Sequence, residues 1–322
     1  MALIETSQAN ITHKSNNNVQ EQQEQENLGF IPVVHVKDVY KSFDYKNNKN
    51  NSSSIATTSD HLSGQQKQQQ QQQLNSTRSL RASSHEVLNG VDLKIKEGEF
   101  VTIVGSSGCG KSTLLNIIAG LDRPDSGSVL IRGHLANSDR SSTKRIMIFQ
   151  EGALFPWLNV QDNVEFGLKI AKMPKEMSRR VANKYIEMVG LSKFSESFPY
   201  QLSGGMKQRV AIARALAMEP EVLLMDEPFA ALDIQTQNLL HEELVGIHKT
   251  TGKTILFVTH NINEAILLGD RIIVLSSVLK DIKKEFLIET PRPRDPESPE
   301  LYEIKKQILR EFEGDLQIAK RR

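Results

Sequence analysis

Apolar residues along this chain gather in short runs rich in Val, Ile and Leu, and these runs alternate with segments of helical spacing. Short apolar runs bounded by turn residues predict strands, whereas a repeat near 3.6 residues predicts helices. Strands are predicted at 33–43, 87–95, 100–104, 127–131, 145–149, 222–225, 254–259 and 272–275, with the one at 145–149 buried. Strands that alternate with helices favour an α/β fold with a mainly parallel sheet and helices on both faces.

Helical spacing dominates from about residue 160 to 198, with a break at Met173 and Pro174, because proline cannot continue a helix without the loss of a hydrogen bond. A further helix is predicted at about 205–218. The stretch at about 155–215 is therefore predicted to form a helical subdomain inserted between two strands of the sheet.

The segment after residue 275 predicts a C-terminal extension, at 281–322, with little regular structure before one final helix. Residues 291–296 have the sequence Pro-Arg-Pro-Arg-Asp-Pro and predict a stiff connector. Ser298 then fits the N-cap of a helix and Pro299 its first turn. This helix is expected to pack one face on the body, through apolar side chains at helical spacing: Leu301, Ile304, Ile308 and Phe312.

Two segments are too polar to form a core. Residues 1–30 are rich in Asn and Gln, and residues 46–84 contain an unbroken glutamine run at 68–73. Such segments bury too little apolar surface to offset backbone entropy, so a disordered arm and a disordered insertion are predicted. For the insertion, a docking element is the alternative, and a tolerated loop is favoured because closure costs grow only logarithmically with length.

Composition narrows the class of protein. A formal net charge of +1 over 322 residues gives no bulk attraction to nucleic acid or to anionic lipid. The single cysteine, Cys109, excludes an intramolecular disulfide and agrees with a reducing compartment. Neither a membrane span nor a secretory signal is predicted, since no long apolar run and no basic start followed by an apolar core are present.

The strongest chemical signal directly follows the strand at 100–104. Eight consecutive residues between a strand and a helix fit the phosphate-loop pattern G-x-x-x-x-G-K-[ST], and Thr113 follows them: Gly105, Ser106, Ser107, Gly108, Cys109, Gly110, Lys111 and Ser112. Glycines let backbone N–H groups face the phosphates, and the helix N-terminus adds partial positive charge. Lys111 is predicted to reach the β- and γ-phosphates, and the Ser112 hydroxyl to ligate Mg²⁺. The chain is therefore predicted to bind a nucleoside triphosphate.

A second motif, Leu-Ser-Gly-Gly-Met-Lys-Gln-Arg at 202–209, resembles the signature of ATP-binding cassette (ABC) ATPases. Ser203 and the amides of Gly204 and Gly205 stand at the predicted start of a helix, where an anion binds well. In that family the anion is the γ-phosphate of ATP held by the other subunit's phosphate loop. The resemblance therefore implies two cassettes that close head to tail around two ATP molecules.

The strand at 222–225 resembles the Walker B strand of the same family. The resemblance implies that Asp226 holds Mg²⁺, directly or through water, and that Glu227 is the general base for the attacking water. Gln150 matches the Q-loop glutamine, which touches Mg²⁺ or the lytic water. His260, at the end of the strand at 254–259, matches the switch histidine that contacts the γ-phosphate.

Residues 231–233 match the D-loop, which runs along the dimer interface. Phe43 matches the aromatic residue that stacks on adenine, with Tyr45 as the alternative. The resemblance covers roughly residues 32–280 and implies an ABC ATPase domain at 31–280. The implied fold is a P-loop NTPase of ABC type with a mainly parallel sheet core, an antiparallel β region and the helical subdomain, and the implied cofactors are ATP and Mg²⁺.

Several features favour a transport subunit over a soluble ABC protein. The chain has one cassette and no sustained heptads, whereas soluble members usually carry two cassettes or a long coiled coil. Phe155 and Trp157 follow the Q-loop, where the family forms the groove that receives a permease helix. The segment at 151–157 resembles that of bacterial importers of nitrate, sulfonates and taurine.

The resemblance thus implies the ATP-hydrolysing subunit of an importer, peripheral at the cytoplasmic face of the membrane. Its expected partners are membrane permease subunits, a second ABC ATPase subunit (a copy or a paralogue) and, indirectly, a solute-binding protein, but no nucleic acid. A soluble, non-transport ABC ATPase with a regulatory or assembly role is the alternative that the sequence leaves open.

Overall fold

The computed structural model describes residues 31–44, 84–136, 145–150 and 153–321. The predicted disordered arm and nearly all of the predicted insertion lie outside these residues, and so does Tyr45.

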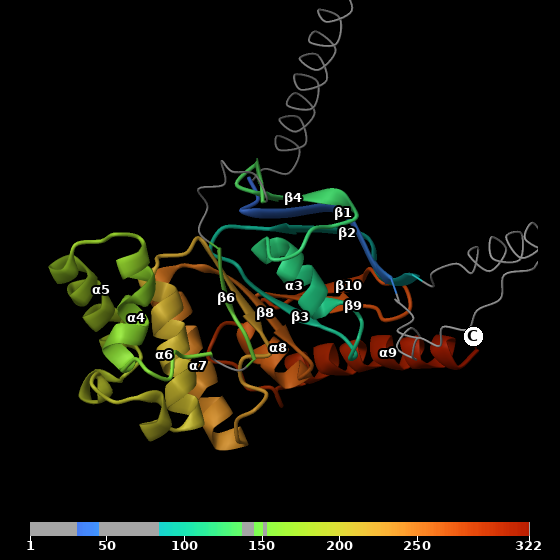
Figure 1. Cartoon of the computed structure of the whole chain (residues 1–322). Helices are drawn as coiled ribbons and strands as arrows, with labels where there is room; N and C mark the ends of the chain where they lie inside the picture. Colours follow the sequence, from blue (N-terminus) through green and yellow to red (C-terminus); the bar gives the residue numbers. More distant parts are fainter. Residues whose placement is uncertain (1–30, 45–83, 137–144, 151–152, 322) are drawn as a thin grey trace, which may run out of the picture.

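One sheet is antiparallel and has four strands in the order β2-β1-β4-β5. Its strands are β1 (Val34–Asp44), β2 (Ser84–Ile95), β4 (Ser126–Ile131) and β5 (His134–Leu135). On the central strand β1, Val34 pairs with Ile95 on one side and with Ile131 on the other. This sheet is the antiparallel β region that the family resemblance implied, and it covers α3 from above in Figure 1.

The second sheet has six strands in the order β10-β9-β3-β8-β7-β6. Its strands are β3 (Phe100–Val104), β6 (Arg145–Ile148), β7 (Val222–Asp226), β8 (Thr254–Thr259), β9 (Arg271–Leu275) and β10 (Ile282–Leu287). Five strands run parallel, and β10 pairs antiparallel with β9 at one edge. Every residue of β3 and of β8 is buried, as continuous apolar strands covered on both faces require.

Helix α3 (Lys111–Ala119) lies between the two sheets, and its buried leucines and isoleucines join the apolar core with both. On the other face of the parallel sheet lie α7 (Ile234–Thr251) and α8 (Ile262–Leu268). At the left of Figure 1 stand α4 (Val160–Ile170), α5 (Lys175–Met188) and α6 (Gly204–Ala217), joined by the short 3₁₀ turns Ser192–Phe194 and Pro199–Gln201. Pro174 is the N-cap of α5, so the predicted break falls between α4 and α5.

The burial predicted for one strand was wrong, and one strand of the six-stranded sheet was missed. The strand predicted as buried at 145–149 is instead the edge strand β6, whose first three residues are only partly buried and after which Phe149 is half exposed. Strand β10 was not predicted at all, because its sequence is mostly charged and only Phe286 within it is buried. The parallel sheet therefore extends seven residues beyond the boundary predicted at residue 280, to Leu287.

The final helix, α9 (Pro299–Arg321), begins at the predicted proline. Leu301 and Ile308 are fully buried, with Ile304 and Phe312 packed against the same cluster, so the predicted contact face is confirmed. Ser298 does not act as a side-chain cap, because its hydroxyl has no hydrogen-bond partner among the described residues. Asp315, nearly buried, accepts hydrogen bonds from the Ser276 hydroxyl at 2.7 Å and from Lys283 at 2.8 Å.

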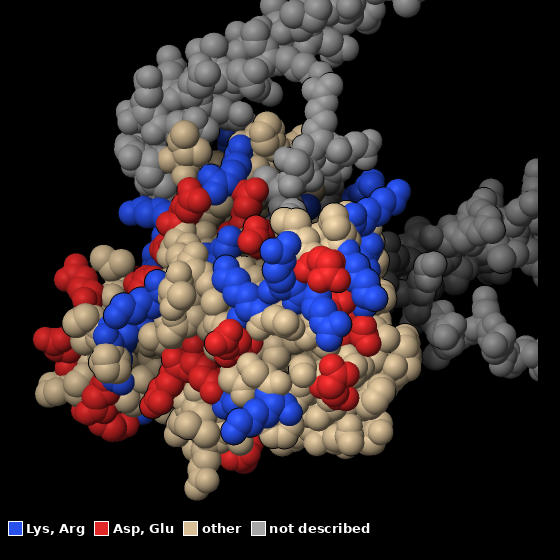
Figure 2. All heavy atoms as spheres, turned by 90° about the vertical axis from the view of Figure 1, so that its left-hand side faces the viewer, with Lys and Arg blue, Asp and Glu red and all other residues tan. Residues whose placement is uncertain are grey.

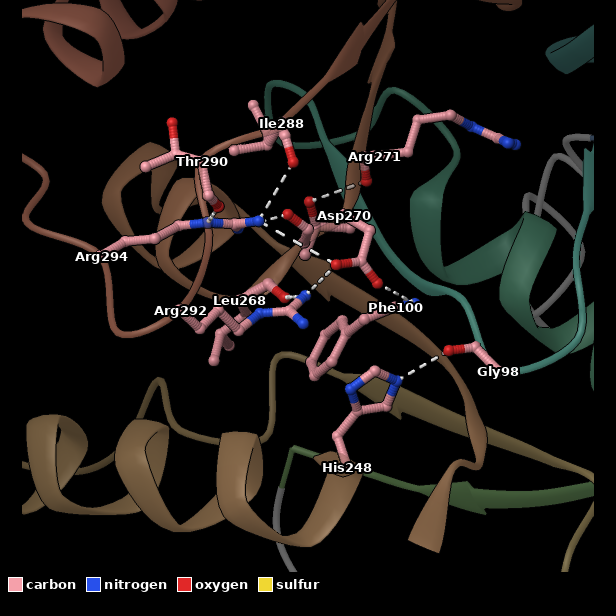
Figure 3. A network of polar contacts seen from close by, with 12 residues as sticks. Gly98, Phe100, His248, Leu268, Asp270, Arg271, Ile288, Thr290, Arg292 and Arg294 are labelled. Atoms are coloured by element: carbon pink, nitrogen blue, oxygen red, sulfur yellow. Dashed lines mark hydrogen bonds and ion pairs between the residues drawn. The ribbon is translucent and has the colours of Figure 1, made fainter. Parts of the chain in front are cut away.

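The proline- and arginine-rich segment before α9 is fastened to the body by polar contacts (Figure 3). Arg292 pairs with the Asp270 carboxylate at 2.7 Å and lies over the Phe100 ring, with the guanidinium carbon 5.5 Å from the ring centroid. Asp270 also accepts from the Phe100 N–H at 2.9 Å. Arg294 donates to backbone carbonyls at the end of α8, among them Ile266 at 2.8 Å. The predicted connector is thus part of the packed structure.

Lys, Arg, Asp and Glu side chains are intermixed over the face shown in Figure 2, as expected for a net charge near zero. Among the described residues, the structure contains no helix that is both long enough and apolar enough to cross a membrane.

Candidate nucleotide site

The phosphate loop connects the buried end of β3 to the first turn of α3. Gly108 and Gly110 have φ angles of 75° and 105°, in the left-handed region that favours glycine. The ammonium group of Lys111 donates to two loop carbonyls, Gly105 O at 2.8 Å and Ser106 O at 3.2 Å. The lysine thus lies folded over the loop, where a phosphate could replace these carbonyls as its partner.

Close packing beneath the loop explains two further positions in the motif. A Cβ atom on Gly105 would stand 2.5 Å from the Cys109 sulfur and 2.6 Å from the Leu275 carbonyl oxygen, so only glycine fits. Cys109 is fully buried, and burial raises the pKa of its thiol despite the nearby Lys111. The cysteine is therefore an unreactive packing residue of the loop floor.

The Ser112 hydroxyl donates to the Asp226 carboxylate at 3.1 Å, which joins the start of α3 to the end of β7. Burial is the largest cause that raises the pKa of Asp226, and the charge of Glu227 adds to it, while Ser112 and Lys111 oppose it. An oxygen pair of this kind, a hydroxyl and a carboxylate side by side, suits Mg²⁺, which prefers oxygen ligands and binds through few protein groups. The residues therefore fit the metal that the sequence predicts.

Glu227 and His260 meet at the carboxyl ends of β7 and β8. The Nδ1 atom of His260 lies 2.8 Å from the Glu227 carboxylate, although the two residues are 33 positions apart. Glu227 has a φ angle of 45°, a left-handed conformation that is costly for a residue with a side chain. Its N–H nevertheless bonds to Val258 O at 2.9 Å, so neighbouring structure holds the residue in place.

Gln150 stands two residues beyond the end of β6, and it is exposed. Because β6 and β7 run parallel with Ile148 opposite Met225, the segment that carries Gln150 leaves the sheet beside Asp226. The predicted Q-loop residue thus lies at the same edge of the sheet as the predicted metal-binding and catalytic carboxylates.

Phe43 lies on β1 with its ring about half exposed. Two residues earlier, Lys41 pairs with Leu88 of β2, and Leu88 would contact a Cβ atom on Gly110 at 2.8 Å. This register places β1 next to the Leu88 residue that packs against the phosphate loop, with Phe43 opposite His85 further along β2. Lys41 lies 5.1 Å from the Phe43 ring centroid and bonds to Asp122 at 2.9 Å, which ties the aromatic residue to the segment after α3.

The signature residues stand at the start of α6, in a different part of the molecule from α3 (Figure 1). Ser203 is the N-cap and accepts from the Met206 N–H at 3.3 Å, while Ser203 and Gly204 are both exposed. Gly205 is buried, and a Cβ atom there would stand 2.5 Å from the Thr236 methyl group of α7. Gly205 is therefore required for close packing, whereas Ser203 and Gly204 are free to meet a ligand.

A groove of about 400 Å³ opens between β6, α4 and α6. Its lining is mostly apolar and consists of Ile146, Met147, Ile148, Phe149, Ala153, Phe155, Phe166, Gly167, Ala211, Arg214, Ala215 and Met218. Phe155, one of the two predicted groove residues, is in this lining. Trp157 is not; it is 70% exposed and lies beside Phe155, with ring centroids 5.7 Å apart.

Sequence reasoning missed three polar side chains near these sites. Arg214 lines the groove, lies over the Phe155 ring and donates to Ala153 O at 2.9 Å. His241 and Glu264 form a buried pair behind the Glu227–His260 contact. A charged residue within an otherwise apolar helix face was the available signal for Arg214 and Glu264.

The fold and the site define a P-loop nucleotide-binding protein, since a strand, a glycine-rich loop and a helix lead to a hydroxyl–carboxylate pair and a carboxylate–histidine pair. The family model described as ABC transporter matches residues 88–230. The nitrate import ATP-binding protein NrtD of Synechocystis is 47% identical over 220 residues, which is 68% of this chain and 82% of that protein. The chain belongs to the ABC transporter ATP-binding family and is a transport-type ATPase.

Two further comparisons agree with this family. The aliphatic sulfonates import ATP-binding protein SsuB of Bacillus cereus is 43% identical over 235 residues, covering 73% of this chain and 92% of that protein. An ATP-binding cassette solved as a dimer in a post-hydrolysis state with ADP and Pi is 34% identical, with a TM-score of 0.60 over 80% of this chain and 100% of that one. The predicted fold class is therefore confirmed.

Proposed function

We propose that this chain is the ATP-hydrolysing subunit of an importer for a small anion such as nitrate or a sulfonate. The observation that supports ATP hydrolysis in this proposal is the contact of 2.8 Å between Glu227 and His260, beside the Ser112–Asp226 pair at the carboxyl ends of the parallel strands. Such a grouping provides a general base, its orienting partner and a metal-binding hydroxyl–carboxylate pair.

In the proposed reaction, Lys111 and the phosphate-loop amides hold the phosphates of ATP, and Phe43 stacks on the adenine. Glu227 takes a proton from a water molecule whose oxygen forms a bond to the γ-phosphorus, while the bond to the oxygen that bridges to the β-phosphate breaks. His260 orients Glu227 through its Nδ1 atom and then contacts the γ-phosphate. Gln150 contacts Mg²⁺ or the attacking water, and its position next to the groove couples nucleotide binding to that groove.

Mg²⁺ would be held by Ser112 and Asp226, with Gln150 nearby, and would neutralise charge on the β- and γ-phosphate oxygens. The pKa of Asp226 is raised by burial, and a bound cation would offset that penalty on the carboxylate.

The second half of the site is proposed to come from another cassette. Ser203 and Gly204 are exposed at the N-terminus of α6, where the helix dipole favours an anion. In the proposed dimer, these groups hold the γ-phosphate of ATP bound to the partner's phosphate loop. Because ATP then bridges the two subunits only in the closed form, ATP binding favours closure and hydrolysis reverses it.

The transport role rests on the relatives and on the groove. Relatives at 43–47% identity are named as nitrate and sulfonate import ATP-binding proteins. An apolar groove of about 400 Å³ next to Gln150 has the character of a site for a helix of a permease at the cytoplasmic face of the membrane. A solute-binding protein would supply the anion to that permease.

The test uses the full-length chain with a tag and the substitution Glu227→Gln, which keeps the size of the side chain but removes the base. The purified variant should bind ATP and hydrolyse it about 100-fold more slowly or worse, the usual contribution of a general base. Membranes solubilised in mild detergent with ATP should then yield this chain, a second cassette and a multi-span permease, identified by mass spectrometry.

Glu227→Gln combined with Lys111→Ala is the matched control, since the lysine is needed for ATP and the capture should then fail. Hydrolysis by Glu227→Gln at the unmodified rate would overturn the assignment of the base. Normal ATP affinity after Lys111→Ala would overturn the phosphate site. Capture of a soluble assembly without any permease would overturn the transport role and favour the regulatory alternative.

A further inference from the structure

Behind the Glu227–His260 contact, a second set of contacts joins the same two residues by a different route. Two residues after Glu227, the buried Phe229 ring meets the His241 ring edge to face, with centroids 5.4 Å apart. His241 Nε2 lies 2.9 Å from one oxygen of Glu264. The other oxygen of Glu264 accepts from the Thr259 hydroxyl at 2.5 Å, and Thr259 directly precedes His260.

Together with the direct contact between Glu227 and His260, these contacts form a closed circuit of six residues: Glu227, Phe229, His241, Glu264, Thr259 and His260. Three members away from the site are at least nine-tenths buried and polar, namely His241, Glu264 and Thr259. A buried carboxylate is costly unless it is well bonded, and Glu264 is bonded through both oxygens. The donors that satisfy it come from two different elements, α7 and the end of β8.

The Thr259 hydroxyl also acts on the chain beyond His260. It accepts from the Asn261 N–H at 2.9 Å, and the Asn261 side chain caps α8 by accepting from the Asn263 N–H at 2.9 Å. The residues on both sides of His260 are therefore held by one hydroxyl group, whose orientation Glu264 sets. His260 itself is exposed over 60% of its side chain, so its own packing does little to fix it.

Helix α7 connects the other end of this arrangement to the D-loop. Gln237 of α7 donates to Phe229 O at 2.9 Å and to Leu232 O at 3.1 Å, and Asp233 caps the helix by accepting from the Thr236 N–H at 3.0 Å. Gln237 and His241 are four residues apart and so lie on the same face of α7. One face of α7 therefore links the loop at 231–233 to His241.

We propose that His241 and Glu264 are positioning residues for ATP hydrolysis, which hold His260 against Glu227 and couple it to the D-loop at the start of α7. A carboxylate can only accept, so Nε2 of His241 carries the proton of that hydrogen bond, and Nδ1 has no hydrogen-bond partner among the described residues. The Glu264 carboxylate therefore needs one hydrogen-bond donor at position 241 of α7. The inference rests on the proposed function, because it assumes that His260 and Glu227 serve the hydrolysis step.

The experiment measures kcat and KM for Mg·ATP with the full-length chain and three substitutions, at a temperature where all variants are folded. His241→Phe keeps a ring against Phe229 but removes the donor, and should lower kcat by about 10- to 100-fold, the cost of misplacing a catalytic group by roughly 1 Å. KM for ATP should stay within about twofold, because neither residue contacts the phosphate loop. His241→Gln restores a donor to Glu264 and should recover most of the rate.

His248→Phe is the matched control on the same helix. The Nε2 atom of His248 lies 2.9 Å from the Gly98 carbonyl oxygen, and its ring meets Phe100 edge to face at 5.2 Å (Figure 3). Like His241, it therefore combines an Nε2 contact to an oxygen with an edge-to-face contact to a phenylalanine ring. His248 lies away from His260, and its substitution should leave kcat within about twofold of the unmodified chain. An equal loss of rate in both Phe variants would mean that α7 is merely weakened, and would overturn the proposal.

The decisive readout is His241→Phe in a His260→Ala background. If His241 acts through His260, the second substitution should change kcat by less than about twofold there, since coupled residues are not additive. An equal factor in both backgrounds, or no effect of His241→Phe at all, would overturn the proposal. A failure of the proposed function would give a different result, because His260→Ala alone would then leave the rate of hydrolysis unchanged.

Discussion

Removal of the Arg294 guanidinium should destabilise the whole cassette, although Arg294 lies far from the nucleotide site in the sequence. Its side chain is only 2% exposed. It donates to four backbone carbonyls: Thr290 at 2.7 Å, Ile266 at 2.8 Å, Gly269 at 2.5 Å and Ile288 at 3.2 Å. Two of these carbonyls, Ile266 and Gly269, belong to the last turn of α8 and the residue after it.

The size of the effect follows from these contacts. Burial, with a smaller contribution from Arg292, lowers the pKa of Arg294 to about 10, while Asp270 opposes the shift. The group therefore remains charged at pH 7. Each hydrogen bond from a charged donor contributes about 1.5–3 kcal/mol, but burial of the charge offsets much of the sum. We expect Arg294→Ala to lower the free energy of unfolding by about 3–5 kcal/mol, the range for breaking a buried ionic network.

Equilibrium unfolding in urea, followed by circular dichroism, measures this loss. Arg294→Lys keeps the charge but not the planar fork, so it should fall between Arg294→Ala and the unmodified chain. Arg310→Ala, on the exposed side of α9, is the control and should change stability by less than about 0.5 kcal/mol. If Arg294→Ala cost no more than the control, water would replace the guanidinium without penalty and the reasoning would be wrong.

Two further outcomes follow from the structure. Phe149→Asp places a charge in the apolar groove at a half-exposed position. In the Glu227→Gln chain with ATP, this substitution should abolish capture of the permease without a change in ATP affinity. The control is Leu287→Asp, which is 65% exposed at the opposite edge of the sheet and should leave capture intact. Burial lowers the pKa of His248 below its ordinary value, and the charge of Arg292 adds to this shift while the Gly98 carbonyl opposes it. As the pH falls, His248 is therefore protonated in the unfolded chain before it is protonated in the folded chain. Stability should therefore fall as pH drops from about 7 to 5, and His248→Phe should flatten that slope in urea titrations; an unchanged slope would assign the pH dependence to other groups.

The parts of the fold that could be predicted are those whose pattern is local. Strands β3, β7 and β8 are continuous apolar runs because helices and sheet cover both faces, and the phosphate loop needs glycine at fixed positions for steric reasons. Gln150, Asp226, Glu227 and His260 lie with the phosphate loop at the carboxyl ends of β3, β6, β7 and β8, whereas Phe43 lies on β1 and the signature residues stand at the start of α6. Their roles in catalysis remain predictions.

The parts that could not be predicted depend on contacts between distant segments. Strand β10 has Lys283, Lys284 and Glu285 in succession, and these residues fit a strand only because β9 offers an open edge and α9 supplies acidic partners. The apolar sequence of β6 does not indicate that this strand lies at the edge of the six-stranded sheet. Arg292 and Arg294 look like solvated charges in the sequence, since the Asp270 carboxylate and the α8 carbonyls reach them only in the folded chain.

Helix α8 explains why so many polar groups are buried near the site. It has only seven residues, of which Ala265, Ile266 and Leu268 supply the buried apolar contacts. Directional hydrogen bonds hold both ends, with Asn261, Thr259 and Glu264 at the start and Arg292 and Arg294 at the end. Since His260 directly precedes the helix cap, a fixed α8 fixes the backbone of His260, and the contact with Glu227 can persist although Glu227 pays for an unfavourable φ of 45°. The buried polar groups thus hold the backbone on one side of the strained Glu227–His260 contact.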